Sequence, residues 1–153
     1  MQKFTILGAM IAVALLFSTM GEALAQRDFS KVQIKTIPVG GNVSMLMGAG
    51  GNIGVVAGED GIFMIDDQFA PLTPKILAAV KKISTKPIHF LLNTHWHFDH
   101  TGGNTNIGKL GTTIVAHENV RSTMAVDQVL KAFKRTVPAS PKIALPVITF
   151  NDT

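Results

Sequence analysis

The chain has 153 residues, of which 46% are apolar and 16% are charged, and its formal net charge is +4. These values are typical of one folded domain, and they exclude a disordered or fibrous chain. Cysteine is absent, which excludes disulfides, thiolate metal ligands and a cysteine nucleophile. The lysines and arginines are scattered along the sequence, so we expect a solvated surface and no nucleic-acid partner.

Residues 1–25 have the three parts of a secretory signal peptide. A lysine precedes an apolar run at residues 4–17, and Ala23 and Ala25 match the small-residue pattern of a cleavage site. An uncleaved membrane anchor is the alternative, although the run is short for a bilayer span. We therefore expect cleavage after Ala25, a mature domain of residues 26–153 without membrane association, and a periplasmic or secreted location.

The first part of the mature chain is predicted to form β-strands. Residues 32–47 alternate loosely between two faces, as in a strand with one buried side. Two runs rich in β-branched residues, 53–57 and 62–65, flank the tetrapeptide Gly-Glu-Asp-Gly at positions 58–61. Glycines and acidic residues of this kind form tight turns, so we expect a β-hairpin here.

A glycine cluster at residues 48–54 precedes this hairpin. It does not match the dinucleotide-binding pattern G-x-G-x-x-G, because Ile53 stands where the third glycine would be. No glycine-lysine-serine or glycine-lysine-threonine sequence follows, so a phosphate-binding loop is not indicated either. The cluster is therefore predicted to be an ordinary turn between strands.

Helical periodicity begins after the hairpin. Thr73 is predicted to be the N-cap of a helix and Pro74 its first residue, where the missing N–H has no cost. Apolar residues then recur at helical spacing as far as Ile83, and Pro87 excludes a continuation. Residues 88–92 are nearly all apolar, which indicates a buried strand.

A second helix–strand unit follows. We expect a short helix at residues 104–110, a strand at 112–116, a helix from 118 to 133, and the start of a strand at 147–150. Alternating strands and helices predict an α/β layered domain. The sequence ends in what we expect to be the middle of that domain.

Three of the five histidines lie within residues 95–100, in the pattern H-x-H-x-D-H. In an extended segment, side chains two positions apart share a face, so His95, His97 and Asp99 would converge while the aromatic residues between them anchor the loop. Two imidazoles and a carboxylate are suitable zinc ligands. His100 breaks the alternation and would point elsewhere, as a second nearby metal would require.

The sequence around these residues resembles a known signature. Residues 94–104 read T-H-W-H-F-D-H-T-G-G-N, which is similar to the motif of the metallo-β-lactamase superfamily. The resemblance extends over nearly all of the mature chain. It implies an αββα sandwich with its metal site between the two sheets, of which this chain would be the N-terminal part, with the C-terminal half missing.

The resemblance also implies roles for individual residues. His95 and His97 would ligate a first zinc, and Asp99 and His100 a second. Asp66 would support the histidine loop without binding metal itself. Asp99 would also be catalytic, because it would orient the hydroxide held between the two zincs.

The family's remaining ligands come from its C-terminal half. They are a third histidine for the first metal, a bridging aspartate and a last histidine for the second metal, and we expect none of them in this chain. His117 follows a predicted strand and is expected to be structural, although it remains a candidate third ligand. His89 lies within a strand and is expected to be structural as well.

The resemblance implies an exported zinc-dependent hydrolase that uses metal-bound hydroxide on an ester, amide or β-lactam bond of a small molecule. One alternative is an iron-dependent oxidoreductase of the same superfamily, since histidine and aspartate also bind iron. The other alternative is an inactive, truncated metal-binding fragment that needs a C-terminal half. Such a fragment would leave an apolar sheet face uncovered, which predicts self-association.

Overall fold

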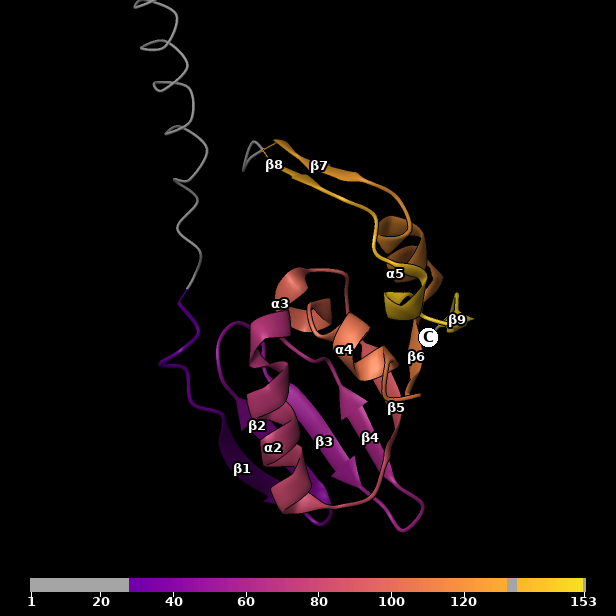
Figure 1. Ribbon diagram of the computed structural model, residues 1–153. Helices are drawn as coiled ribbons and strands as arrows, with labels where there is room; N and C mark the ends of the chain where they lie inside the picture. The colour runs from indigo at the N-terminus through magenta and orange to yellow at the C-terminus, as the bar shows by residue number, and fades with distance from the viewer. Residues whose placement is uncertain (1–27, 132–134, 153) are drawn as a thin grey trace, which may run out of the picture.

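The computed structural model describes residues 28–131 and 135–152. Its main body is a seven-stranded sheet with the longest helix packed on one face (Figure 1). The predicted signal peptide lies outside the described residues. No helix found in the two described ranges has both the length and the apolar character that a bilayer crossing requires.

The sheet has the strand order β1-β2-β3-β4-β5-β6-β9. The strands from β1 to β4 are joined as antiparallel neighbours, whereas β5, β6 and β9 are added in parallel. Both predicted strands of the hairpin, β3 and β4, have the bounds expected from the sequence. The strands are β1 Lys35–Gly40, β2 Val43–Met47, β3 Ile53–Ala57, β4 Ile62–Ile65, β5 Ile88–Asn93, β6 Thr113–His117 and β9 Ile148–Phe150.

Helices connect the parallel strands, as the alternating pattern predicted. The helices are α2 Thr73–Ile83, α3 Phe98–Thr101, α4 Asn104–Gly108 and α5 Glu118–Met124, with short 3₁₀ turns at Ala70–Leu72 and Lys142–Ala144. Each parallel strand pair needs such a crossover, because a tight turn can join only antiparallel neighbours.

The start of α2 differs from the prediction by one residue. Leu72 occupies the N-cap position, and no side chain caps the helix. The prediction of Thr73 as N-cap was wrong because the preceding 3₁₀ turn runs directly into the helix. The Thr73 hydroxyl instead accepts a hydrogen bond from Nδ2 of Asn106 at 3.1 Å. Pro74 lies in the first turn, as expected.

The predicted long helix after position 118 was also wrong. α5 ends at Met124, and the chain continues as a two-stranded hairpin of β7 Gln128–Leu130 and β8 Arg135–Val137 (Figure 1). The side chain of Gln128 donates to the carbonyl oxygen of Thr123 at 2.8 Å, so it bonds a group near the helix end. The end of the predicted helix, at residues 132–134, lies outside the described residues.

The core lies between one face of the sheet and α2. Alternate residues of the central strands are fully or almost fully buried there, together with one face of the helix. Burying apolar area of this kind supplies most of the favourable free energy of folding. The buried members are Leu46, Ile53, Val55, Ile62, Met64, Leu72, Ile76, Ala79, Val80, Leu91, Ile107 and Ile114.

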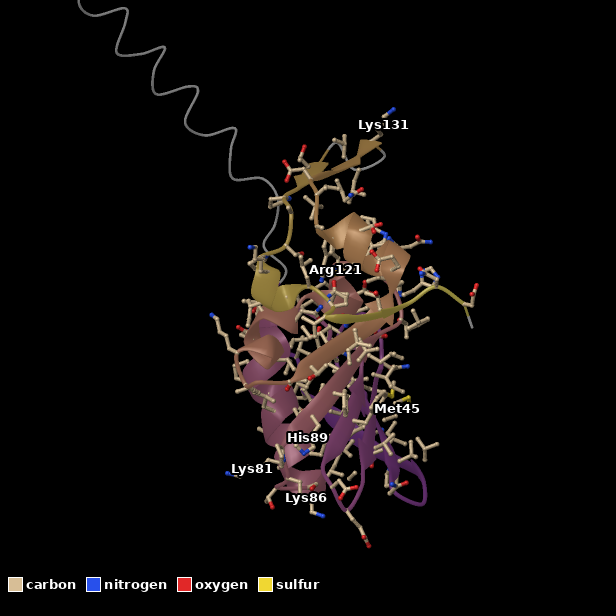
Figure 2. All side chains as sticks on the ribbon, turned by 90° about the vertical axis from the view of Figure 1, so that its right-hand side faces the viewer. Met45, Lys81, Lys86, His89, Arg121 and Lys131 are labelled. Atoms are coloured by element: carbon tan, nitrogen blue, oxygen red, sulfur yellow. The ribbon has the colours of Figure 1, made fainter. Side chains whose placement is uncertain are left out.

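The opposite face of the sheet, which we call the open face, is also apolar. Strand register aligns two rows of side chains across it. One row is Ile37, Met45, Gly54, Ile65, Leu92, Val115 and Ile148, and the other is Val43, Val56, Phe63, Phe90 and Thr113. Figure 2 shows Met45 on the side of the sheet away from Lys81 of α2. These two rows contain no charged residue, and 42% of Phe90 is exposed.

Candidate metal centre

The histidine motif lies at the carboxyl end of β5, beside the carboxyl end of β4. These strands are parallel neighbours, so the residues that follow them meet at one edge of the sheet. Ligand sites of open α/β sheets are commonly found at this edge. Asp66 comes directly after β4, and Thr94 directly after β5.

The motif is only partly extended, contrary to the prediction. Residues 94–97 form an irregular bend, and Phe98–Thr101 then forms the single helical turn α3. The carbonyl oxygen of His97 accepts hydrogen bonds from the backbone N–H groups of His100 and Thr101, each at 3.0 Å. The expectation that one extended face aligns the ligands was wrong, because these bonds favour the helical turn. Asp99 is therefore displayed by α3.

The four predicted ligands are nevertheless close together. The ring centroids of His95 and His97 are 4.9 Å apart, and those of His95 and His100 are 3.9 Å apart. Nε2 of His100 lies 3.5 Å from Oδ2 of Asp99. The three imidazoles and the Asp99 carboxylate therefore form one group, which we call the histidine cluster.

The buried carboxylate of Asp66 accepts hydrogen bonds from residues of the histidine loop. It is 3% exposed. Its Oδ1 accepts from the backbone N–H of Thr94 at 2.8 Å, and its Oδ2 accepts from the Thr94 hydroxyl at 2.8 Å and from Nδ1 of His100 at 2.7 Å. The bond to Asp66 places the proton of His100 on Nδ1 and leaves Nε2 available. Carboxylates orient metal-binding imidazoles in the same way.

Asp66 also orients His95, indirectly, through the Thr94 hydroxyl. Its Nδ1 lies 3.1 Å from the Thr94 hydroxyl oxygen, whose single proton is donated to Asp66. Nδ1 of His95 must therefore be the donor in this contact, since the hydroxyl has no second proton. Burial lowers the pKa of His95, and the neighbouring His100 and His97 lower it further. The neutral imidazole, which is the metal-binding form, is thereby favoured.

The cluster fits zinc by the chemistry of its donors. Imidazole nitrogens and carboxylate oxygens bind zinc at about 2.0–2.2 Å, so two ligands of one tetrahedral ion lie about 3.3 Å apart. The separation of 3.5 Å between His100 Nε2 and Asp99 Oδ2 is close to that value. Across the described ranges, however, no three histidine or acidic side chains are arranged around one common point. The residues present match the type of ligand and one pairwise spacing, but form no complete coordination sphere.

A buried amide pair supports both ends of the histidine loop. Asn104 Nδ2 donates to Asn93 Oδ1 at 2.8 Å, and Asn93 Nδ2 donates to Asn104 Oδ1 at 3.1 Å. Asn104 also donates to the carbonyl oxygen of Ala144 at 2.9 Å. Sequence reasoning missed the role of Asn93. The available signal was a polar residue that ends an otherwise apolar strand.

Asp67 is a second buried carboxylate that the sequence analysis did not single out. It is 1% exposed, and its Oδ1 accepts from the backbone N–H of Gly103 at 2.9 Å. Its Oδ2 has no hydrogen-bond partner among the described residues. Burial raises the pKa of this carboxyl well above its ordinary value, the Gly103 bond opposes the rise, and the charge of Asp66 adds to it.

The two other histidines have structural contacts. Nδ1 of His117 accepts from the backbone N–H of Asn119 at 3.1 Å and so caps α5, while its Nε2 lies 3.0 Å from the carbonyl oxygen of Asn151. Nε2 of His89 contacts the carbonyl oxygen of Asp60 at 2.9 Å. His89 lies near the start of β5, whereas the histidine motif follows the other end of this strand. The structure does not bring either residue to the cluster.

The aromatic residues of the motif pack beside the ligand loop, and the ring centroids of Trp96 and His97 are 5.0 Å apart. Trp96 packs against a small core that includes Val120, Met124 and Leu145. Trp96 and Phe98 also line a cavity of about 150 Å³ beside α5. This packing connects the loop to the outer part of the sheet and restrains its backbone.

Comparison with known families agrees with this fold. A family model described as the metallo-β-lactamase superfamily matches residues 47–151, which is more than half of the chain. The matched range includes the central strands, Asp66 and the complete histidine motif.

Solved structures of metallo-β-lactamases are similar in fold. One described as the first B3 enzyme with an active-site glutamic acid has 25% identity and a TM-score of 0.60, and the match covers 70% of this chain and 43% of the other. An enzyme of Novosphingobium pentaromativorans has 22% identity and a TM-score of 0.66, with coverages of 86% and 50%. A subclass B3 enzyme of Bradyrhizobium japonicum has 22% identity and a TM-score of 0.61, with coverages of 85% and 48%.

This chain thus spans about half the length of the structures that it matches. Over the matched part, the α/β fold predicted from the sequence is confirmed.

Proposed function

The chain belongs to the metallo-β-lactamase superfamily, as residues 94–104 predicted, and from this premise we propose that it is an exported zinc-dependent hydrolase. The proposed substrates are small molecules with an ester, amide or β-lactam bond. The observation that carries the proposal is the histidine cluster, in which four donor side chains meet at the carboxyl ends of two parallel strands.

Each residue of the cluster has a proposed role. His95 and His97 would hold one zinc, and Asp99 and His100 the other. Zinc bound there would polarise a substrate carbonyl and lower the pKa of a coordinated water. Asp66 holds the proton on Nδ1 of His100 and thereby keeps Nε2 available for the metal. Asp99 would orient the attacking water and accept its proton, and its side chain is accessible, with 34% exposed.

The first test is native mass spectrometry of the full chain after zinc addition. We expect zinc to be retained, and we expect His95→Ala and His97→Ala to lower the retained amount because each removes a nitrogen ligand. His89→Ala is the matched control, since His89 lies outside the cluster, and it should retain zinc like the unmodified chain. Zinc-dependent hydrolysis of a chromogenic β-lactam and a chromogenic ester would then identify the bond cleaved. Equal zinc retention by all three variants would contradict the proposed site.

An inactive metal-binding chain is the second candidate. It is favoured by the absence, within the described residues, of three donors around one point. Catalytic zinc sites use three protein ligands and one open position, so this candidate needs ligands from another segment. It predicts at most one zinc, readily lost on dilution, and no hydrolysis. Two firmly retained zincs with turnover would exclude it.

An iron-dependent oxidoreductase is the third candidate. The donor set favours it as much as zinc, because imidazole and carboxylate ligands also suit iron. Metal analysis of the protein purified from cells without added metal separates the two. Iron in place of zinc, with no hydrolysis after zinc exchange, would support the oxidoreductase.

Export is proposed from the predicted signal peptide. If residues 1–25 direct secretion, the exported protein should begin at Gln26, and intact-mass measurement of the periplasmic or secreted fraction tests this directly. A product that still carries the first 25 residues would instead support a membrane anchor.

Self-association is proposed through the open face. Its two rows contain no charged residue, and Lys35, which pairs with Met47 on the same face, lies on the edge strand β1. A second copy of the chain can therefore pack against these rows without burying an unpaired charge. The matched part of the chain covers 43% to 50% of the length of the compared structures, so the matched parts of two copies together have about the length of one such structure. A face-to-face dimer would cover the open face of each copy.

A further inference from the structure

Gln68 is buried in a conformation that is unusual for its residue type. It is 0% exposed, and its φ of 56° lies in the left-handed region. Residues other than glycine adopt this region at a cost and keep it only where surrounding contacts require it. The side chain is therefore held by surrounding contacts, and these are made with the loop between β2 and β3.

That loop, residues 48–52, is the glycine segment. Nε2 of Gln68 donates to the carbonyl oxygen of Gly51, and Oε1 accepts from the backbone N–H of Ala49 at 3.4 Å. A Cβ atom on Gly48 would lie 2.6 Å from this same Oε1. The glycine segment is thus hydrogen-bonded to the buried amide of Gln68. Because Gly48 has no Cβ, this amide has room beside the segment.

The other side of the glycine segment contacts the histidine cluster. A Cβ atom on Gly51 would overlap the imidazole of His100, and one on Gly50 would overlap Cβ of Asp99. Gly50 also has a φ of 79°, which favours glycine. Backbone therefore packs directly against two of the predicted ligands, at a distance that no side chain would allow.

The main chain of Gln68 reaches the far side of the same ligands. Its carbonyl oxygen accepts from the backbone N–H of Gly103 at 3.1 Å, just after α3, which carries Asp99 and His100. A Cβ atom on Gly102 would lie 2.7 Å from this carbonyl oxygen. Gln68 therefore bonds both the glycine segment, through its side chain, and Gly103 after α3, through its carbonyl oxygen.

We propose that Gln68 is a positioning residue that holds the glycine segment against Asp99 and His100. The segment limits rotation of the His100 ring, which keeps Nδ1 on Asp66 and Nε2 available for a metal. This inference rests on the proposed function for its meaning, because a metal site is what requires a fixed imidazole. The contacts themselves are present without metal, so they are testable without it.

The first experiment uses NMR on the metal-free full chain and compares it with Gln68→Met, which keeps the side-chain length but removes both amide bonds. We expect faster hydrogen exchange at the Ala49 amide. We also expect the ring nitrogens of His100 to change from the Nδ1-protonated tautomer to a mixture. Gln68→Glu retains the acceptor for Ala49 but loses the donor to Gly51, so its changes should be intermediate. Thermal unfolding of each variant establishes that it is folded.

The second experiment tests the steric contact alone. Gly51→Ala should disturb the His100 ring signals, because its new methyl group overlaps the imidazole. Gly58→Ala is the matched control, since its nearest contact would be an ordinary 3.6 Å to the carbonyl oxygen of Gly61. Unchanged His100 signals in Gln68→Met and Gly51→Ala would overturn the inference, whether or not the chain binds zinc.

Zinc titration then connects the two proposals. We expect Gln68→Met to weaken the zinc that is bound by Asp99 and His100 by about 10-fold, within the range known for residues that orient ligands. Zinc held by His95 and His97 should be unaffected. If the NMR signals shift as expected but no variant or parent binds zinc, the proposed function fails and the positioning role stands. Altered NMR signals with unaltered zinc affinity would overturn the positioning of metal ligands.

Discussion

The two faces of the main sheet are both apolar, but only one is covered within the described residues. The covered face packs under α2, where Met64 and Leu91 are 0% exposed. The open face presents Phe90 with 42% of its surface exposed, although this residue adjoins Leu91 in the same strand. Apolar character in a strand therefore does not by itself tell whether a partner layer is present. The difference between the faces can be measured, because only the covered face excludes water.

The largest expected effect is on the covered face. Met64→Ala removes a fully buried side chain and leaves a cavity, which should lower the free energy of unfolding by about 2–5 kcal/mol. Met47→Ala is the matched control, because Met47 is 40% exposed at the end of β2 and should change stability by at most about 0.5 kcal/mol. Urea unfolding measures both. Similar losses for the two variants would mean that the faces are equally covered.

A smaller effect is expected at Asp67, which is 1% exposed and lies two residues after the end of β4. Because the pKa of Asp67 is raised in the folded state, folding favours the protonated carboxyl. Stability should therefore fall as the pH rises from the ordinary pKa of 3.8 through the raised one. Asp67→Asn lacks this titration, so its stability relative to the parent should increase over that interval and then level off. Parallel pH profiles of the two proteins would indicate that water reaches this carboxyl.

The smallest effect on monomer stability is expected on the open face. Phe90→Lys replaces a part-exposed side chain whose ring centroid lies 6.3 Å from that of Phe63, so at low protein concentration the free energy of unfolding should fall by only about 1 kcal/mol. The same variant should abolish the proposed dimer, because the lysine charge would be buried between two copies. Analytical ultracentrifugation at rising concentration separates the two effects. Lys81→Ala, on the solvent side of α2, is the control and should associate like the parent.

Local patterns in the sequence determined a large part of this protein. The bounds of β3 and β4 follow from β-branched runs around a glycine turn, and the histidine motif identified both the family and the residues that cluster. These features depend on neighbours a few positions apart, so a single sequence contains the information. The C-terminal part of α5 shows the limit of such reasoning. There, helical periodicity was outweighed by contacts of Gln128 and Asp127 with Thr123 and Ala139.

Contacts between distant segments were decided by the tertiary structure alone. The family resemblance implied that Asp66 supports the cluster, but its bonds to Thr94 and His100 exist only because β4 and β5 are parallel neighbours. The pairing of Asn93 with Asn104, the raised pKa of Asp67 and the hydrogen bonds of Gln68 to the glycine segment could not be derived from a sequence pattern, although a polar residue at the end of an apolar strand marked Asn93. Burial and hydrogen-bond geometry depend on which strands become adjacent. Residue type determined the possible chemistry, and chain packing determined which atoms meet.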